Sequence, residues 1–137
     1  MAETVTNKGK YLIATVGLNG LTLKMAAFTG TQTGVHNADL DTVADLDAVT
    51  SVAIHSERLS LASLTVTEDD ANDRVNADAA NLSFAAAPGV TAQGVVIYHE
   101  VSAADASRQI IVIYTTGFPQ PMDGGLNITV TVYLRLN

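Results

Sequence analysis

Two runs of consecutive apolar residues, separated by a short polar stretch, constrain the fold of this chain more than any other feature. The runs occupy residues 95–98 and 110–114, and the polar stretch is 102–109. Both runs are rich in β-branched and aromatic residues, so residues 91–118 are predicted to form a β-hairpin. Neither run alternates with polar residues, which indicates that both faces of the hairpin are covered. We therefore expect this hairpin to form the centre of the core.

Alternation of apolar with polar residues predicts further strands. It is clearest in residues 126–137, where apolar residues share one face and polar residues share the other. A strand of this kind belongs to an antiparallel sheet that covers a core on one side. Residues 21–28 also alternate, and residues 81–86 are expected to contain a short strand around Leu82 and Phe84.

The segment 58–67 has the composition of a strand, but its apolar positions change face partway along. Leu59 and Leu61 share one face, whereas Leu64 and Val66 share the other. One extra residue near positions 62 and 63 would restore a single buried face, so a β-bulge or bend is predicted there. The acidic segment that follows, residues 68–80, is expected to be a connection between strands.

Two short helices are expected at most. Residues 8–16 carry apolar residues four positions apart, and Asn7 is available as an N-terminal cap, which indicates a helix. Their β-branched residues support a strand equally well, so both alternatives stay open. Within residues 39–50, apolar residues recur at every third position, as in a helical turn packed beneath a loop, with Asp39 or Asp41 as its cap.

The predicted fold class is all-β and mainly antiparallel, a β-sandwich or jelly roll with one or two short helices. The reason is that strands follow one another with turns between them, and no long helices alternate with them. At 137 residues the chain fits a single domain. Residues 1–6 are expected to form a flexible N-terminal arm, and residues 7–137 the single β-sandwich domain.

The composition excludes several classes of function. The net charge is −7 and the basic residues are scattered, so nucleic-acid binding is not expected. The chain has no cysteine, which excludes disulfides and Cys-ligated zinc. It shows neither a secretion signal nor an apolar stretch long enough to span a bilayer, so we expect cytoplasmic synthesis and no membrane partner. Only 15% of the residues are charged, which favours burial of some surface in a homo-oligomer.

The sequence contains no recognisable catalytic, cofactor or metal motif. The acidic run that begins at Asp70 has Arg74 and Val75 where a calcium-binding EF-hand loop requires an oxygen ligand and a glycine. The three histidines are far apart and lack the spacing of zinc ligands. We therefore expect a protein that is not an enzyme and that carries no cofactor and no metal.

Short motifs along most of the chain resemble those of small structural proteins of tailed bacteriophages. They lie at residues 5–11, 23–28, 59–61, 66–74, 91–98 and 111–114. The resemblance implies a non-enzymatic virion protein, either a capsid decoration (cement) protein or another head or tail accessory part. It also implies a place on the capsid surface of the virion after synthesis in the cytoplasm of the host bacterium. One departure is Arg58-Leu59, where relatives tend to have a turn that contains Gly-Tyr.

A decoration protein needs a stable core and segments that grip the shell, so the resemblance implies contacts with the major capsid protein or other virion proteins. The N-terminal arm and the long loop of residues 29–50 are the segments expected to make these contacts. The expected contact residues are Glu3, Thr4, Val5, Val35, His36, Leu40, Val43 and Leu46. The alternative is that both segments are merely disordered surface.

Two other functions need features that this sequence supports less well. A phage tail or head-fibre module that binds a host-surface ligand such as a glycan would need exposed aromatic residues, whereas Tyr98 and Tyr114 lie in apolar runs. A polysaccharide hydrolase would need a pair of carboxylates in a groove. The carboxylates available for this are Asp39, Asp41, Asp45 and Asp47, all expected in loops or caps.

Overall fold

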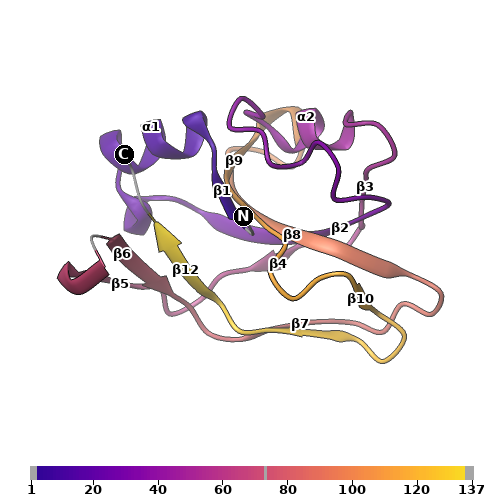
Figure 1. Ribbon diagram of the computed structural model, residues 1–137. Helices are drawn as coiled ribbons and strands as arrows, with labels where there is room; N and C mark the ends of the chain where they lie inside the picture. The colour runs from indigo at the N-terminus through magenta and orange to yellow at the C-terminus, as the bar shows by residue number, and fades with distance from the viewer. Residues whose placement is uncertain (1–2, 73, 135–137) are drawn as a thin grey trace.

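The computed structural model describes residues 3–72 and 74–134, which form antiparallel β-sheets and a few short helices (Figure 1). The strands are β1 (Glu3–Val5), β2 (Leu23–Thr29), β3 (Ala53–Ile54), β4 (Leu59–Ser60), β5 (Thr65–Asp69), β6 (Arg74–Asp78), β7 (Leu82–Phe84), β8 (Thr91–Glu100), β9 (Arg108–Tyr114), β10 (Gln120–Pro121), β11 (Leu126–Ile128) and β12 (Thr131–Leu134). The helices are α1 (Asn7–Thr15) and α2 (Val43–Asp47), with 3-10 turns η1 (Leu18–Gly20), η2 (Asp70–Asn72) and η3 (Asp105–Ser107). Within these ranges, no helix has the length and apolar character needed to cross a membrane.

One large sheet and two small sheets contain the strands. The path through the large sheet is β1-β9-β8-β2-β3, with β10 paired to β8 and β4 paired to β2. The small sheets are β11-β7 and β12-β6-β5, and all these strand pairs are antiparallel. The prediction of an all-β, mainly antiparallel fold with two short helices is therefore confirmed. This strand order does not confirm a jelly roll, which has eight strands in a double sheet.

The predicted central hairpin is confirmed, since β8 and β9 pair with each other in the middle of the large sheet. Consecutive residues of both strands are buried, so both faces of the hairpin are covered as expected. A bulge shifts the register: Ile97 pairs with Val112 and Tyr98 with Ile110, which leaves Ile111 as the extra residue. Ile111 and Val112 consequently belong to the same core cluster.

Two apolar clusters, one on each face of the large sheet, form the core. The first cluster lies between the large sheet and the small sheets, because it joins Ile97 of β8 to Ala77 of β6 and Leu126 of β11. The second cluster lies against the opposite face. It joins Val96 of β8 to the loop of residues 29–50 and to α2.

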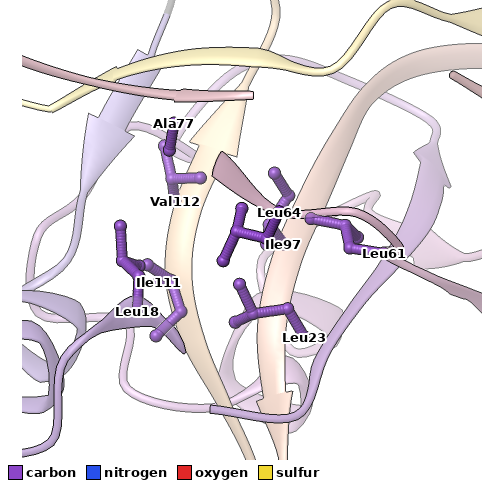
Figure 2. Close-up of a pocket in the computed structure, with 8 residues that line it drawn as sticks. All are labelled: Leu18, Leu23, Leu61, Leu64, Ala77, Ile97, Ile111 and Val112. Carbon is purple, nitrogen blue, oxygen red and sulfur yellow. The ribbon is translucent and has the colours of Figure 1, made fainter. Parts of the chain in front are cut away.

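A small apolar gap remains inside the first cluster. Its volume is about 20 Å³, which is roughly the space of one water molecule. Figure 2 shows the side chains that line it: Leu18, Leu23, Leu61, Leu64, Ala77, Ile97, Ile111 and Val112. Because all of them are apolar, we expect the gap to be dry.

The helix alternative for residues 8–16 is confirmed by α1, although its cap is Thr6 rather than Asn7. The Thr6 hydroxyl accepts a hydrogen bond from the Gly9 backbone N–H (2.9 Å), because Thr6 is the last residue with an extended backbone. Gly9 allows α1 to pack directly on β9, since a Cβ atom at this position would lie 2.5 Å from the Ile111 carbonyl oxygen.

The helical turn expected within residues 39–50 is α2. Its cap is Thr42, so the predicted caps Asp39 and Asp41 are wrong. The Thr42 hydroxyl accepts a hydrogen bond from the Asp45 backbone N–H (3.2 Å), and the Asp45 carboxylate accepts one from the Thr42 backbone N–H (2.9 Å). This reciprocal capping box satisfies two backbone donors at the start of α2.

Residues 3–6 form an edge strand and its continuation, which differs from the expected flexible arm. β1 pairs with β9, with Glu3 opposite Tyr114 and Val5 opposite Val112. Thr6 is fully buried, and its hydroxyl donates a hydrogen bond to the Ile110 carbonyl. Strand pairing satisfies backbone groups of β9 that would otherwise be unpaired, which a local view of a polar segment does not reveal. Residues 1–2 of the expected arm lie outside the described residues.

The acidic segment 68–80 contains part of a hairpin, so the prediction of a simple connection is wrong. β5 and β6 pair across the η2 turn. At this turn the Asp69 carboxylate accepts hydrogen bonds from the Asn72 side-chain amide and from Arg74 Nε (2.9 Å each). These charge-assisted hydrogen bonds stabilise a hairpin whose composition is that of a loop.

The bend predicted near residues 62 and 63 is confirmed. Ser63 has a positive φ of 56°, and here the chain leaves β4 of the large sheet for β5 of a small sheet. The single long strand predicted over residues 126–137 is wrong, because β11 and β12 belong to different small sheets. The alternation of apolar residues continues through this change of sheet and therefore gives no sign of it. Residues 135–137 lie outside the described residues.

Candidate partner-binding surface

The two segments expected to bind a partner, the N-terminal residues and the loop of residues 29–50, lie side by side. His36 links them: its Nδ1 lies 2.8 Å from the Thr4 hydroxyl, and its Nε2 lies 2.8 Å from the Thr115 hydroxyl. Thr4 belongs to β1, and Thr115 directly follows β9. His36 therefore ties the loop to the edge of the large sheet.

A second link joins the same two segments at the start of α1. The Asn7 backbone N–H donates to the Ala38 carbonyl (2.7 Å), and the Asn7 side-chain amide donates to the Asp39 carboxylate (2.7 Å). The Asp39 backbone N–H in turn donates to the Asn37 side-chain oxygen (3.0 Å). We call the resulting region the β1–loop surface; it comprises Thr4, Asn7, His36, Asn37, Asp39 and Leu40.

The two hydrogen bonds of His36 to Thr4 and Thr115 do not require a charged imidazole. His36 is an exposed residue, but partial desolvation of its imidazole lowers the pKa below its ordinary value of 6.5, so the neutral form predominates at neutral pH. A neutral imidazole has one N–H donor and one acceptor nitrogen, and a threonine hydroxyl can take either role. Both hydrogen bonds of His36 can therefore form in either tautomer.

Three of the predicted contact residues have a core role instead of a surface role. Val35, Val43 and Leu46 are fully buried in the second cluster, where a partner cannot reach their side chains. Their spacing in the sequence reflects packing beneath the loop. They hold the loop on the large sheet and so position the residues around them.

Glu3 and Val5 alternate with Thr4 and point to the other face of the large sheet, where Val5 packs on the first cluster. One oxygen of the Glu3 carboxylate is buried and has no hydrogen-bond partner. Burial raises the pKa of this carboxyl, and the charge of Arg74 opposes that shift. Of the eight predicted contact residues, the β1–loop surface thus contains Thr4, His36 and the half-buried Leu40.

Sequence reasoning missed several residues that build this surface. It assigned Asn7 and Asp39 to helix caps and Asn37 to a turn, and it did not single out Thr115. The hydrogen bonds of Asn7 and Thr115 join positions far apart in the chain, so no local pattern predicts them. Only Asn37, a common turn residue, carries a local signal.

A second polar cluster lies at the turn of the β8–β9 hairpin. Glu100 contacts Lys24 Nζ (2.6 Å) and Arg108 (2.9 Å), while Asp105 contacts Arg108 (2.6 Å) and Arg58 (3.5 Å). Hydrogen bonds from Lys24 and Arg108 hold the pKa of Glu100 below its usual range. Since both carboxylates are paired, the cluster ties β2, the hairpin and the segment before β4 together.

Three of the four aspartates considered for a hydrolase have structural partners for their carboxylates. Asp45 caps α2, Asp39 accepts a hydrogen bond from Asn7, and Asp47 accepts one from the Ile54 backbone N–H (3.2 Å). In the part of the chain that the structure describes, no group of three or more His, Cys, Asp or Glu side chains is placed to hold a metal ion.

No protein-family model matches this chain, and it has no significant match among curated proteins or solved structures. The fold and the β1–loop surface, together with the resemblance of its short motifs, are therefore the basis for a functional proposal.

Proposed function

We propose that this chain is a non-enzymatic structural protein of a bacteriophage virion, a decoration (cement) protein that binds and stabilises the capsid shell. One observation carries the proposal. The N-terminal strand and the loop of residues 29–50, which are the segments expected to grip the shell, form a single surface held by His36 and Asn7.

The construction of this surface supports binding with little loss of conformational entropy. The loop is anchored from beneath by its buried apolar residues and from the side by hydrogen bonds to β1 and α1. A segment that is already held in place loses less freedom on binding than a loose one does. Docking would then use a preformed surface rather than an arm that folds on contact.

The chemistry of the surface indicates the kind of contact that the major capsid protein would make. Asn7, His36 and Asn37 are exposed and uncharged at neutral pH, Asp39 is the one carboxylate among them, and Leu40 is half-buried. Such a surface binds mainly through hydrogen bonds and apolar contact. We therefore expect shell binding to depend only weakly on salt concentration.

Co-sedimentation with shells assembled from the major capsid protein of the same genome tests this proposal. Asn7→Arg places a long charged side chain on the β1–loop surface, and Asn81→Arg, at another exposed asparagine, is the matched control. We expect saturable binding of the unmodified chain and of the control. Asn7→Arg should weaken the affinity by about tenfold or more, equal to ~1.4 kcal/mol.

Circular dichroism and thermal unfolding of each variant establish that it is folded before binding is compared. A folded chain that does not sediment with these shells would overturn the decoration proposal. Binding to intact host cells would then be measured, because the alternative is a tail or head-fibre module that recognises a host-surface ligand.

A further inference from the structure

Strand β5 forms an open edge of a small sheet. In the order β12-β6-β5 it pairs with β6 on one side, and among the described residues no strand pairs with it on the other. The side chains of Thr65, Val66, Thr67 and Glu68 are exposed, although they alternate between the two faces of the strand. β5 therefore presents both its side chains and one row of backbone groups to the surroundings.

Natural edge strands usually carry features that prevent pairing with another chain, such as lysine, proline, a bulge or very short length. β5 has five residues, contains neither lysine nor proline, and pairs with β6 in a continuous register. Its first three residues, Thr65, Val66 and Thr67, are uncharged and β-branched, which favours strand pairing. Its only charges are Glu68 and Asp69, at one end.

A mainly apolar groove of about 420 Å³, to which Asn19 adds a polar side chain, lies between the α1–η1 segment and the β5–β6 hairpin. Ile13, Val16 and Leu18 line one side of it, and Val66 and Val75 line the other. Val16 is 54% exposed and Val66 is 38% exposed, which is high for large apolar side chains. Exposed apolar residues that gather beside an unpaired strand are typical of an interaction surface.

We propose that β5 is a self-association edge, at which two copies of this chain pair their β5 strands antiparallel about a two-fold axis. The pairing joins two small sheets into one continuous sheet and satisfies the open backbone groups of both strands. The same contact brings each copy's Val66 and the adjoining groove against the partner copy. Because one patch serves both partners, the interface is closed and forms a dimer.

The positions of the two acidic residues of β5 favour antiparallel over parallel pairing of the two copies. A parallel, in-register pair would place Glu68 opposite Glu68 and Asp69 opposite Asp69, which is unfavourable. In an antiparallel pair centred on Val66 or Thr67, the acidic ends lie at opposite ends of the interface and no carboxylate faces another. A second copy can therefore pair with the open backbone groups of β5 without bringing carboxylates opposite one another.

The proposed β5 interface and the β1–loop surface share no residue, since the first uses β5 and the groove lined by Val16 and Val66, and the second uses Thr4, Asn7 and residues 36–40. In Figure 1 the β5–β6 hairpin lies at the far left, whereas β1 lies nearer the centre, between α1 and α2. The inference does not rest on shell binding, because it is tested on the purified chain alone. Failure of one proposal is thus distinguishable from failure of the other.

Sedimentation equilibrium of the full chain over a concentration series measures the association. The mass is expected to rise from 14.3 kDa toward twice that value. Val66→Lys should hold the chain at the monomer mass. Val101→Lys is the matched control, since Val101 is 61% exposed and lies at the hairpin turn, and it should associate as the unmodified chain does.

A cysteine variant gives a second readout that does not depend on weakening the interface. The chain has no cysteine, so Thr67→Cys introduces a single thiol close to the proposed axis. A short bismaleimide should join Thr67→Cys into covalent dimers, whereas Val101→Cys, although it associates, should not be cross-linked. A monomer mass at every concentration, equal effects of the two lysine variants, a mass beyond the dimer, or no cross-linking of Thr67→Cys would each overturn the inference.

Discussion

Replacement of Gly9 by alanine tests whether close packing of α1 on β9 holds the N-terminal segment in place. Helix propensity alone predicts that Gly9→Ala stabilises the protein by about 1 kcal/mol. The structure predicts the opposite sign, because the new Cβ atom would lie 2.5 Å from the Ile111 carbonyl oxygen and 2.8 Å from its Cα atom. Both are backbone atoms, which cannot rotate away as a side chain can.

The size of the effect follows from these two opposing contributions. Overpacking of a buried site costs typically 1–3 kcal/mol, and contact with a central strand of the large sheet places Gly9→Ala near ~3 kcal/mol. After subtraction of the gain in helix propensity, about 1 kcal/mol, we expect the free energy of unfolding to fall by about 2 kcal/mol. α1 would move away from β9 and carry Thr6 with it.

Urea denaturation, followed by circular dichroism, measures the free energy of unfolding of Gly9→Ala. Ala14→Gly, at an exposed position of the same helix, is the matched control for propensity and should cost about 1 kcal/mol. If Gly9→Ala is as stable as the unmodified chain or more stable, then α1 does not pack against β9 as closely as the structure indicates, and the reasoning fails.

Three further predictions concern the core and the ion-pair cluster. Tyr98→Phe removes a buried hydroxyl that has no hydrogen-bond partner, so the free energy of unfolding should stay constant or rise by about 1 kcal/mol; a loss of that size in urea denaturation would contradict this. Val112→Ile adds one methyl group at the 20 Å³ gap and should stabilise the protein by up to about 0.8 kcal/mol. Val96→Ile, in the second cluster, should destabilise it, and calorimetry measures the thermal stability of both variants. Glu100 has a lowered pKa in the folded state, so its stabilising contribution is present above its ordinary pKa of 4.5 and is lost as the pH falls through the lowered value. Over this acidic range, the free energy of unfolding of Glu100→Gln should therefore depend less on pH than that of the unmodified chain. An equal pH dependence of the two proteins would contradict the ion-pair assignment.

The parts of the fold that sequence reasoning predicted are those with a local cause. The apolar runs of β8 and β9 are buried on both faces, and consecutive apolar residues are the direct signal of that burial. The bend at Ser63 was predicted because a change in the parity of apolar residues requires a change of path. The split between β11 and β12 was not predictable in this way, since a chain can pass from one small sheet to another while its apolar face stays toward the same cluster.

The candidate surface was predicted only as two separate segments. Composition indicated that the N-terminal residues and the loop face the surroundings, but the bond between Thr4 and His36 joins residues that no local pattern relates. The prediction that Val35, Val43 and Leu46 contact a partner was wrong for a related reason. In a polar loop, apolar residues can serve a partner or the protein's own core, and only the three-dimensional arrangement distinguishes the two roles.

Shell binding is expected to depend on the second cluster, whereas self-association is not. Val43 and Leu46 anchor the loop from beneath, so a change that loosens them also displaces His36 from β1. Val66 is exposed and belongs to neither buried cluster, so Val66→Lys alters the β5 edge without removing core contacts. A variant that releases the loop should therefore lose shell binding and still form dimers, and a β5 variant should do the reverse. One substitution that abolishes both in a folded chain would mean that a single interface carries both interactions.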